Sequence, residues 1–78
     1  MRDRKGEPTG IKDYRGVLLH EGDVIKHPEE DVCGTVFWDG DHPHGDHWRV
    51  MYDDGSPSGT LVLQVGDRGM AVKVGSIY

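Results

Sequence analysis

The clearest pattern of apolar and polar positions lies between residues 34 and 55, where two β-rich runs flank a polar loop. The runs cover Gly34–Trp38 and Trp48–Tyr52, and residues 39–47 between them are only Asp, Gly, His and Pro. This pattern predicts a β-hairpin. Because strand side chains alternate between two faces, pairing Trp38 with Trp48 fixes the rest of the register. The predicted pairs are Val36 with Val50 and Gly34 with Tyr52 on one face, and Phe37 with Arg49 and Thr35 with Met51 on the other.

Four further apolar runs predict short strands over residues 17–19, 24–26, 60–65 and 70–74. Glycine-containing turns separate these runs, residues 66–69 are expected to be a hairpin connection, and the twelve glycines of the chain disfavour helix. About five or six short antiparallel strands are typical of an all-β domain, either a small barrel or a sandwich. The alternation predicts a core that contains Val17, Leu19, Val24, Val36, Val50, Leu61, Leu63 and Val72.

The length of the chain bounds its domain organisation. With 78 residues there is room for one domain with a small, marginally stable core, so a homo-oligomer is left open. Residues 1–9 are polar and charged and contain Gly6 and Pro8, which predicts a flexible N-terminal arm. Residues 10–78 then form the single β domain.

Charge and cysteine content restrict the kinds of partner that we expect this protein to bind and the cellular compartment in which we expect it. The formal net charge of −5 argues against binding to a nucleic-acid backbone, which needs clustered Lys and Arg. Cys33 is the only cysteine, so no disulfide can form within the chain. There is no apolar stretch long enough for a membrane span or a signal peptide, and together these features predict a cytoplasmic protein without a membrane partner.

One segment resembles a known family. Residues Thr9-Gly10-Ile11-Lys12-Asp13 through Gly16, followed by Glu21-Gly22-Asp23-Val24-Ile25, are similar to the N-terminal signature of the YopX-like phage and prophage proteins. The resemblance implies a small strand-rich protein of a phage or prophage, with an SH3-like barrel, in the cytoplasm of a bacterial host. It carries over no catalytic residue. By their own chemistry Asp13, Glu21 and Asp23 are expected to form turns or face solvent.

The loop between the two hairpin strands is rich in metal-ligating side chains. His42, His44 and His47 lie within six positions and alternate with carboxylates such as Asp41. Imidazole and carboxylate groups could ligate Zn(II) or Ni(II), although the spacing matches no known ligand motif. The alternative is a flexible solvated loop.

The second chemical pattern is aromatic. Trp38, Trp48 and Tyr52 stand near Asp53 and Asp54, with Arg49 between them, and the stretch WRVMYDDG resembles the third strand and turn of Tudor-type barrels. That resemblance implies an aromatic cage for a methylated cation, which aromatic ring faces attract. The alternative is that these rings form the core of a small domain, with Trp38 and Trp48 partly exposed at its rim.

These patterns predict a non-enzymatic accessory or binding module that engages a protein partner from the host or the phage. Capture of a cationic or methylated ligand and metal binding by the His/Asp loop are the alternatives. An enzyme alternative is a plasmid-borne trimethoprim-resistant dihydrofolate reductase, whose layout residues 22–24 and 34–38 resemble. Its Val-Gln-Ile-Tyr run is absent, however, and Leu63-Gln64-Val65 is a poor substitute.

Overall fold

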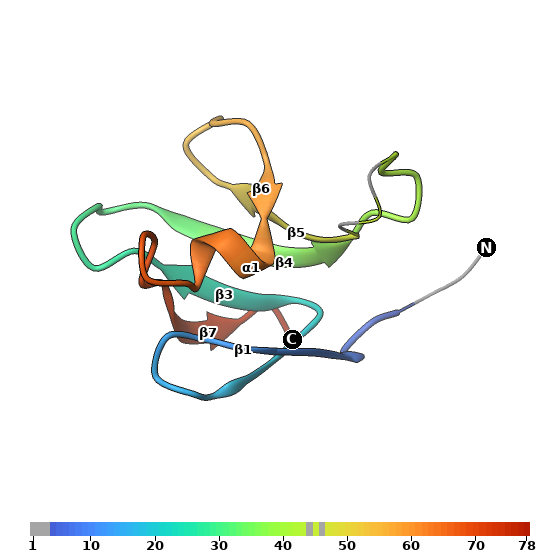
Figure 1. Cartoon of the computed structure of the whole chain (residues 1–78), viewed down its shortest axis with the longest axis horizontal. Helices are drawn as coiled ribbons and strands as arrows, with labels where there is room; N and C mark the ends of the chain where they lie inside the picture. The colour runs from blue at the N-terminus through green and yellow to red at the C-terminus, as the bar shows by residue number, and fades with distance from the viewer. Residues whose placement is uncertain (1–3, 44, 46) are drawn as a thin grey trace.

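The computed structural model of the chain describes residues 4–43, 45 and 47–78 and consists of two antiparallel sheets and one short helix (Figure 1). The strands pair in the orders β1-β2 and β6-β5-β4-β3-β7. Within the described residues no closed barrel forms, because the two sheets share no ladder of hydrogen bonds. In chain order the elements are β1 (Pro8–Lys12), β2 (Leu18–His20), β3 (Asp23–Lys26), β4 (Cys33–Trp38), β5 (Trp48–Tyr52), β6 (Gly59–Thr60), α1 (Leu61–Gln64) and β7 (Val72–Ser76).

The central hairpin has the predicted register throughout. Trp38 pairs with Trp48 and Val36 with Val50 across β4 and β5. The remaining pairs are Gly34 with Tyr52, Thr35 with Met51 and Phe37 with Arg49. Gly34 is required by this packing, because a Cβ atom there would lie 2.3 Å from the side chain of Val50. The hairpin therefore forms the centre of the five-stranded sheet.

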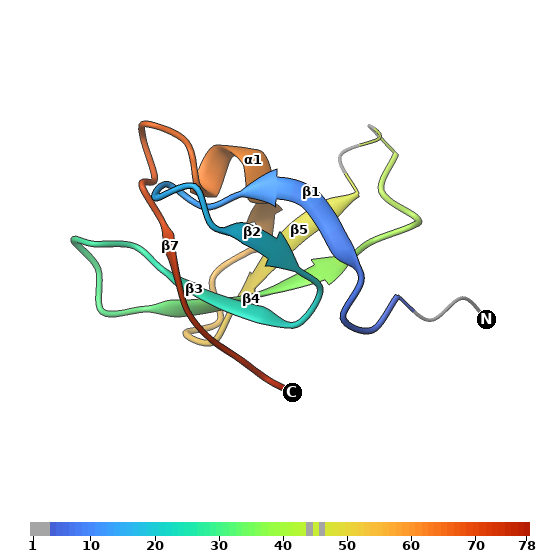
Figure 2. The same ribbon diagram turned by 90° about the horizontal axis from the view of Figure 1, so that it is seen from below.

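The hydrophobic core lies on one face of the five-stranded sheet, where side chains from the sheet pack against those of β2 and α1. Ile25, Val36 and Val50 project from β3, β4 and β5 and have no exposed area. Leu19 of β2 and Leu61 of α1, also fully buried, pack onto them. Seen from below, the β1–β2 hairpin lies in front of the larger sheet (Figure 2). One apolar layer thus holds the two sheets and the helix together.

The strand predicted over residues 60–65 is wrong beyond its first residue. Only Gly59–Thr60 form a strand, and the chain then turns into α1, in which the Val65 N–H donates to the Leu61 carbonyl at 3.1 Å. Leu61 and Val65 are four residues apart, so one helical turn places both on the core side. Leu63 lies on the other side and is 65% exposed, against the prediction that it is buried.

Two further core predictions fail, one because β2 begins one residue later than predicted and one because the inward positions of β3 are displaced by one residue. Val17 is 46% exposed, since β2 begins at Leu18 and places Leu19 inside. In β3 the inward positions are Asp23 and Ile25, so Val24 is only half-buried. A shift of one residue moves every side chain to the other face of a strand, which accounts for Val24, whereas Val17 precedes β2 and its N–H donates to Asp13.

The C-terminal strand is also displaced from its prediction. Strand β7 covers Val72–Ser76 and not 70–74, and Val72 is half-buried where a core position was expected. Residues 66–69 are not a hairpin connection, because they join α1 to β7. The Ala71 N–H donates to the Gln64 carbonyl at 3.0 Å, which places Ala71 in the core with no exposed area.

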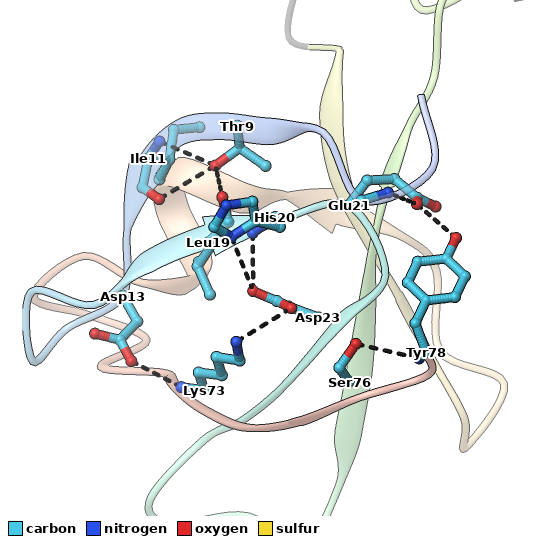
Figure 3. Close-up of polar contacts among 11 residues, drawn as sticks. Thr9, Ile11, Asp13, Leu19, His20, Glu21, Asp23, Lys73, Ser76 and Tyr78 are labelled. Carbon is cyan, nitrogen blue, oxygen red and sulfur yellow. Dashed lines mark hydrogen bonds and ion pairs between the residues drawn. The ribbon is translucent and has the colours of Figure 1, made fainter. Parts of the chain in front are cut away.

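Two buried carboxylates fasten the β1–β2 hairpin to β7 (Figure 3). Asp13 is 5% exposed; its Oδ1 accepts the N–H groups of Arg15 and Val17, and its Oδ2 accepts the N–H of Lys73 at 2.8 Å. Asp23 is 3% exposed, accepts the His20 N–H at 2.8 Å and lies 3.4 Å from the Lys73 ammonium. Asp13 and Asp23 therefore form local turns, as predicted, and also join segments far apart in the sequence.

The N-terminal residues that the structure describes lie against the domain. Pro8 and Thr9, assigned to the arm, belong to β1, and the Glu7 N–H donates to the Arg4 carbonyl in a turn before it. The Gly6 N–H donates to Glu21 at 3.0 Å. Among the described residues no helix is long and apolar enough to cross a membrane.

Candidate binding site

The residues of the predicted aromatic site are divided between the two ends of the β4–β5 hairpin. Trp38 and Trp48 pair beside the 39–47 loop, whereas Tyr52 pairs with Gly34 at the far end. Trp48 and Tyr52 are four residues apart on one strand, a separation of roughly 13 Å. The three rings therefore do not surround a single cation, and each end of the hairpin has its own chemistry.

At the loop end, three rings form an aromatic cluster of Trp38, Trp48 and His47. Trp48 meets Trp38 edge to face, with ring centroids 5.0 Å apart and planes at 70°. The His47 ring lies 4.8 Å from Trp38, and its Nδ1–H donates to the Asp39 carbonyl at 2.8 Å. Edge-to-face pairs at these distances are favourable because ring edges are positive and ring faces negative. Trp48 also packs against the core, and Trp38 is the outer member of the cluster.

The N-terminal turn places a cation on this cluster. The Arg4 Cζ lies 3.9 Å from the centroid of the Trp38 ring, within the range of a cation–π contact. Arg4 also forms an ion pair with Glu7, while its Nε is buried without a hydrogen-bond partner among the described residues. This contact has no local signal in the sequence, because an arginine in a polar segment shows the same pattern whether or not it lies on an aromatic ring.

Arg49 connects the His-rich loop to the strand beside it. Its Nη1 donates to His42 Nε2 at 2.8 Å, and its Nη2 donates to the Ser58 carbonyl at 2.9 Å. The guanidinium thus occupies one of the two imidazole nitrogens with which His42 could bind a metal ion. Within the described residues no group of three His, Cys, Asp or Glu side chains could hold a metal ion. The structure does not describe His44, and Asp41 is exposed, so the metal site stays a prediction.

At the far end, Tyr52 lies in a polar network that the sequence did not indicate. His27 Nε2 lies 2.6 Å from the Tyr52 hydroxyl, which in turn donates to Oε1 of Gln64. The other imidazole nitrogen, Nδ1, donates to the Gly69 carbonyl at 2.9 Å. Burial, together with the negative charges of Glu30 and Asp54, raises the pKa of Tyr52 to about 12. The hydroxyl is therefore neutral and acts as a fixed link between β5 and α1.

The two acidic residues after Tyr52 form a turn. Asp53 and Asp54 are exposed, and the Asp53 N–H donates to the Cys33 carbonyl at 3.1 Å. Asp54 Oδ1 accepts the Ser56 N–H at 2.9 Å, and hydrogen bonds from Ser56 lower the pKa of Asp54. Asp54 and Tyr52 line an open cleft next to the network, together with residues of α1 and of the 27–32 loop.

The fold and these two sites define the chain as a small, mostly β domain with antiparallel sheets and one short helix. Comparison with protein-family models, with curated proteins and with solved structures finds no match to this chain.

Proposed function

We propose that this protein is a non-enzymatic binding module that engages a protein partner by accepting a cationic side chain on the face of Trp38. The observation that carries the proposal is the Arg4 guanidinium 3.9 Å from the Trp38 centroid. A ring face that holds a guanidinium from its own chain has the geometry and electrostatics to hold one from a partner. The proposal combines the expected protein interaction with cation capture, and it confines capture to one ring.

Arg4 is a poorly satisfied occupant of this ring, which makes its exchange for a partner side chain feasible. A cation–π contact near the surface contributes about 0.5–1 kcal/mol, and a partly exposed ion pair such as Arg4–Glu7 about 0–1 kcal/mol. Against these gains, a buried donor without an acceptor costs about 1–3 kcal/mol, and Arg4 Nε is such a donor. The contact is thus close to neutral in free energy.

The chemistry of the cluster indicates which side chains a partner would present. A planar guanidinium or a methylated ammonium is weakly hydrated and loses little when it leaves water for an aromatic face. Arg49 donates to His42 and to the Ser58 carbonyl, and its side chain leaves β5 on the face opposite to Trp48. Arginine or methylated lysine in a partner protein is the ligand class that we propose.

Fold and origin are part of the same proposal. The antiparallel order β6-β5-β4-β3-β7, with a single helical turn before the last strand, supports an SH3-like arrangement that resembles Tudor domains. A phage or prophage accessory protein in the bacterial cytoplasm is proposed on the resemblance of residues 9–25 and on the single cysteine.

Paired variants of the arm test the proposal. The probe is a capped peptide with one arginine or trimethyl-lysine between glycines, and its affinity is measured by titration of the full chain. Arg4→Ala removes the internal competitor, so the probe should bind several-fold more tightly than to the parent. Lys5→Ala is the matched control, because it removes the same charge from the next residue, whose ammonium lies 4.9 Å from the Tyr78 ring centroid.

A second variant removes the aromatic ring and should lower the affinity for the probe. Trp38→Leu keeps an apolar side chain but removes the π face, so binding of the probe should be lost while urea unfolding shows a folded protein. The proposal is wrong if a glutamine peptide binds as well as the cationic probes, or if folded Trp38→Leu binds them as the parent does.

A further inference from the structure

A cleft of about 930 Å³ opens at the end of the hairpin that is remote from Trp38. The 27–32 loop forms one wall, the turn after β5 another, and α1 with residues 66–70 the third. Val62 and Leu63 of α1 line it and are 53% and 65% exposed. Exposed apolar side chains gathered along one concave surface are typical of a contact site and unusual for a solvated wall.

Hydrogen bonds hold the walls of the cleft in place. His27 joins the end of β3 to Tyr52 of β5 and to the Gly69 carbonyl, and Tyr52 joins Gln64 of α1. Gly69 passes so close to α1 that a Cβ atom there would lie 2.1 Å from the Gln64 carbonyl oxygen. The cleft is therefore formed before any ligand arrives, which lowers the entropic cost of binding.

Next to this cleft the backbone departs from common geometry. Met70 lines the cleft with φ at +52°, and among the described residues it is the one non-glycine residue with a positive φ. Such a conformation costs free energy for a residue with a side chain and is found most often where function requires it.

The rim of the cleft is acidic. Glu29, Glu30, Asp54 and Asp67 line it, against one guanidinium, that of Arg68. The field of Glu30 and Asp54 reaches the floor, where both carboxylates act on Tyr52. Exposed apolar side chains on one wall, those of Val62 and Leu63, together with an acidic rim are complementary to a chain segment that presents both apolar and cationic side chains.

We propose that this cleft is a second binding site, which takes an extended segment of a partner protein with lysine or arginine beside leucine-like side chains. The proposal does not depend on the Trp38 site, because the two lie at opposite ends of the hairpin. The occupant is a protein segment and not a nucleic acid, since the rim would repel phosphate groups.

The test is a titration of the isotope-labelled full chain with a short capped peptide of alternating leucine and lysine, followed by amide NMR shifts. Shifts should concentrate in residues 27–32, 52–57 and 61–70, and affinity should fall as salt rises. A peptide with glutamate in place of lysine should not bind. Butylammonium alone should bind far more weakly than the peptide.

Two variants complete the test. Leu63→Lys removes an apolar contact and adds a like charge at an exposed position, so the affinity should fall about tenfold or more. Met51→Lys is the matched control, because Met51 is 59% exposed on the other face of the sheet. In this variant the affinity for the peptide should fall only by the long-range repulsion from the added charge. Glu30→Gln should weaken binding about threefold.

Three results would overturn the proposal. The first is an absence of amide shifts around the cleft at millimolar peptide. The second is equal binding of the lysine and glutamate peptides, which would remove the role of the rim. The third is equal loss of affinity in Leu63→Lys and Met51→Lys, which would show a general charge effect.

Discussion

Asp13 offers the sharpest test of how the fold is held together. Three backbone N–H groups, of Arg15, Val17 and Lys73, donate to its buried carboxylate at 2.8–2.9 Å. Asp13→Asn keeps the shape and one acceptor oxygen but sets an amide N–H₂ against one of the donors. Loss of at least one charge-assisted hydrogen bond should lower the free energy of unfolding by about 2 kcal/mol. Asp13→Ala leaves all three donors unpaired and should cost about 4 kcal/mol.

Urea unfolding followed by tryptophan fluorescence measures the effect. For a domain of this size the slope is about 1 kcal/mol per molar urea, so Asp13→Asn should lower the midpoint by about 2 M. The exposed Asp53→Asn is the control and should change the free energy by less than about 0.5 kcal/mol. If Asp13→Asn unfolds at the parent midpoint, the carboxylate does not fasten the hairpin to β7.

The acid dependence gives an independent measure of the same carboxylate. Burial of Asp13 alone would raise its pKa, but hydrogen bonds from the backbone of Lys73, Val17, Arg15 and Gly16 outweigh burial and lower the pKa below 3.8. The folded state therefore favours the ionised carboxylate, and its contribution is complete above the unfolded pKa and is lost as pH falls through the folded pKa. The difference in stability between the parent and Asp13→Asn should accordingly shrink below about pH 4. A difference that stays constant down to pH 2 would contradict the assignment.

Three further predictions concern the site and its supports. In a titration followed by absorbance, one tyrosine should ionise near pH 12, and this transition should be absent in Tyr52→Phe. The free energy of unfolding should fall between about pH 10 and pH 12, because the unfolded chain loses the tyrosine proton at a lower pH than the folded chain. Gly69→Ala should cost about 2 kcal/mol or more, because its Cβ would clash with backbone, whereas Gly75→Ala meets nothing within 4 Å and should be neutral by the same urea assay. Trp48→Ala should cost about 3 kcal/mol because its ring packs on the core, and Trp38→Ala distinctly less; equal costs would contradict the division into a core ring and an outer ring.

The central hairpin was predictable from sequence because its pattern allows one solution. A loop without apolar residues fixes where Gly34–Trp38 ends and where Trp48–Tyr52 begins. Alternation of side chains then fixes every cross-strand pair. Residues 61–65 have no such constraint. Leu61, Leu63 and Val65 fit a strand, while Leu61 and Val65 alone fit one turn of helix, and so short a run does not distinguish the two periods.

The candidate sites were predictable only in part, for a related reason. Trp38, Trp48 and Tyr52 are conspicuous in the sequence, but their assignment to two ends of a hairpin follows from the strand register. Arg4 and His27 reach these sites by contacts across 34 and 25 positions of the chain. No local propensity encodes such contacts, because they depend on how the arm and the end of β3 pack in three dimensions.

The most direct test of the proposed function uses the two indole N–H signals of the isotope-labelled protein. The arginine or trimethyl-lysine peptide is titrated into the Arg4→Ala chain, and both signals are followed by NMR. The Trp38 signal should move saturably with peptide, the core-packed Trp48 signal should move much less, and a glutamine peptide should move neither. A saturable shift of backbone amides elsewhere with both indole signals unmoved would contradict cation capture by Trp38.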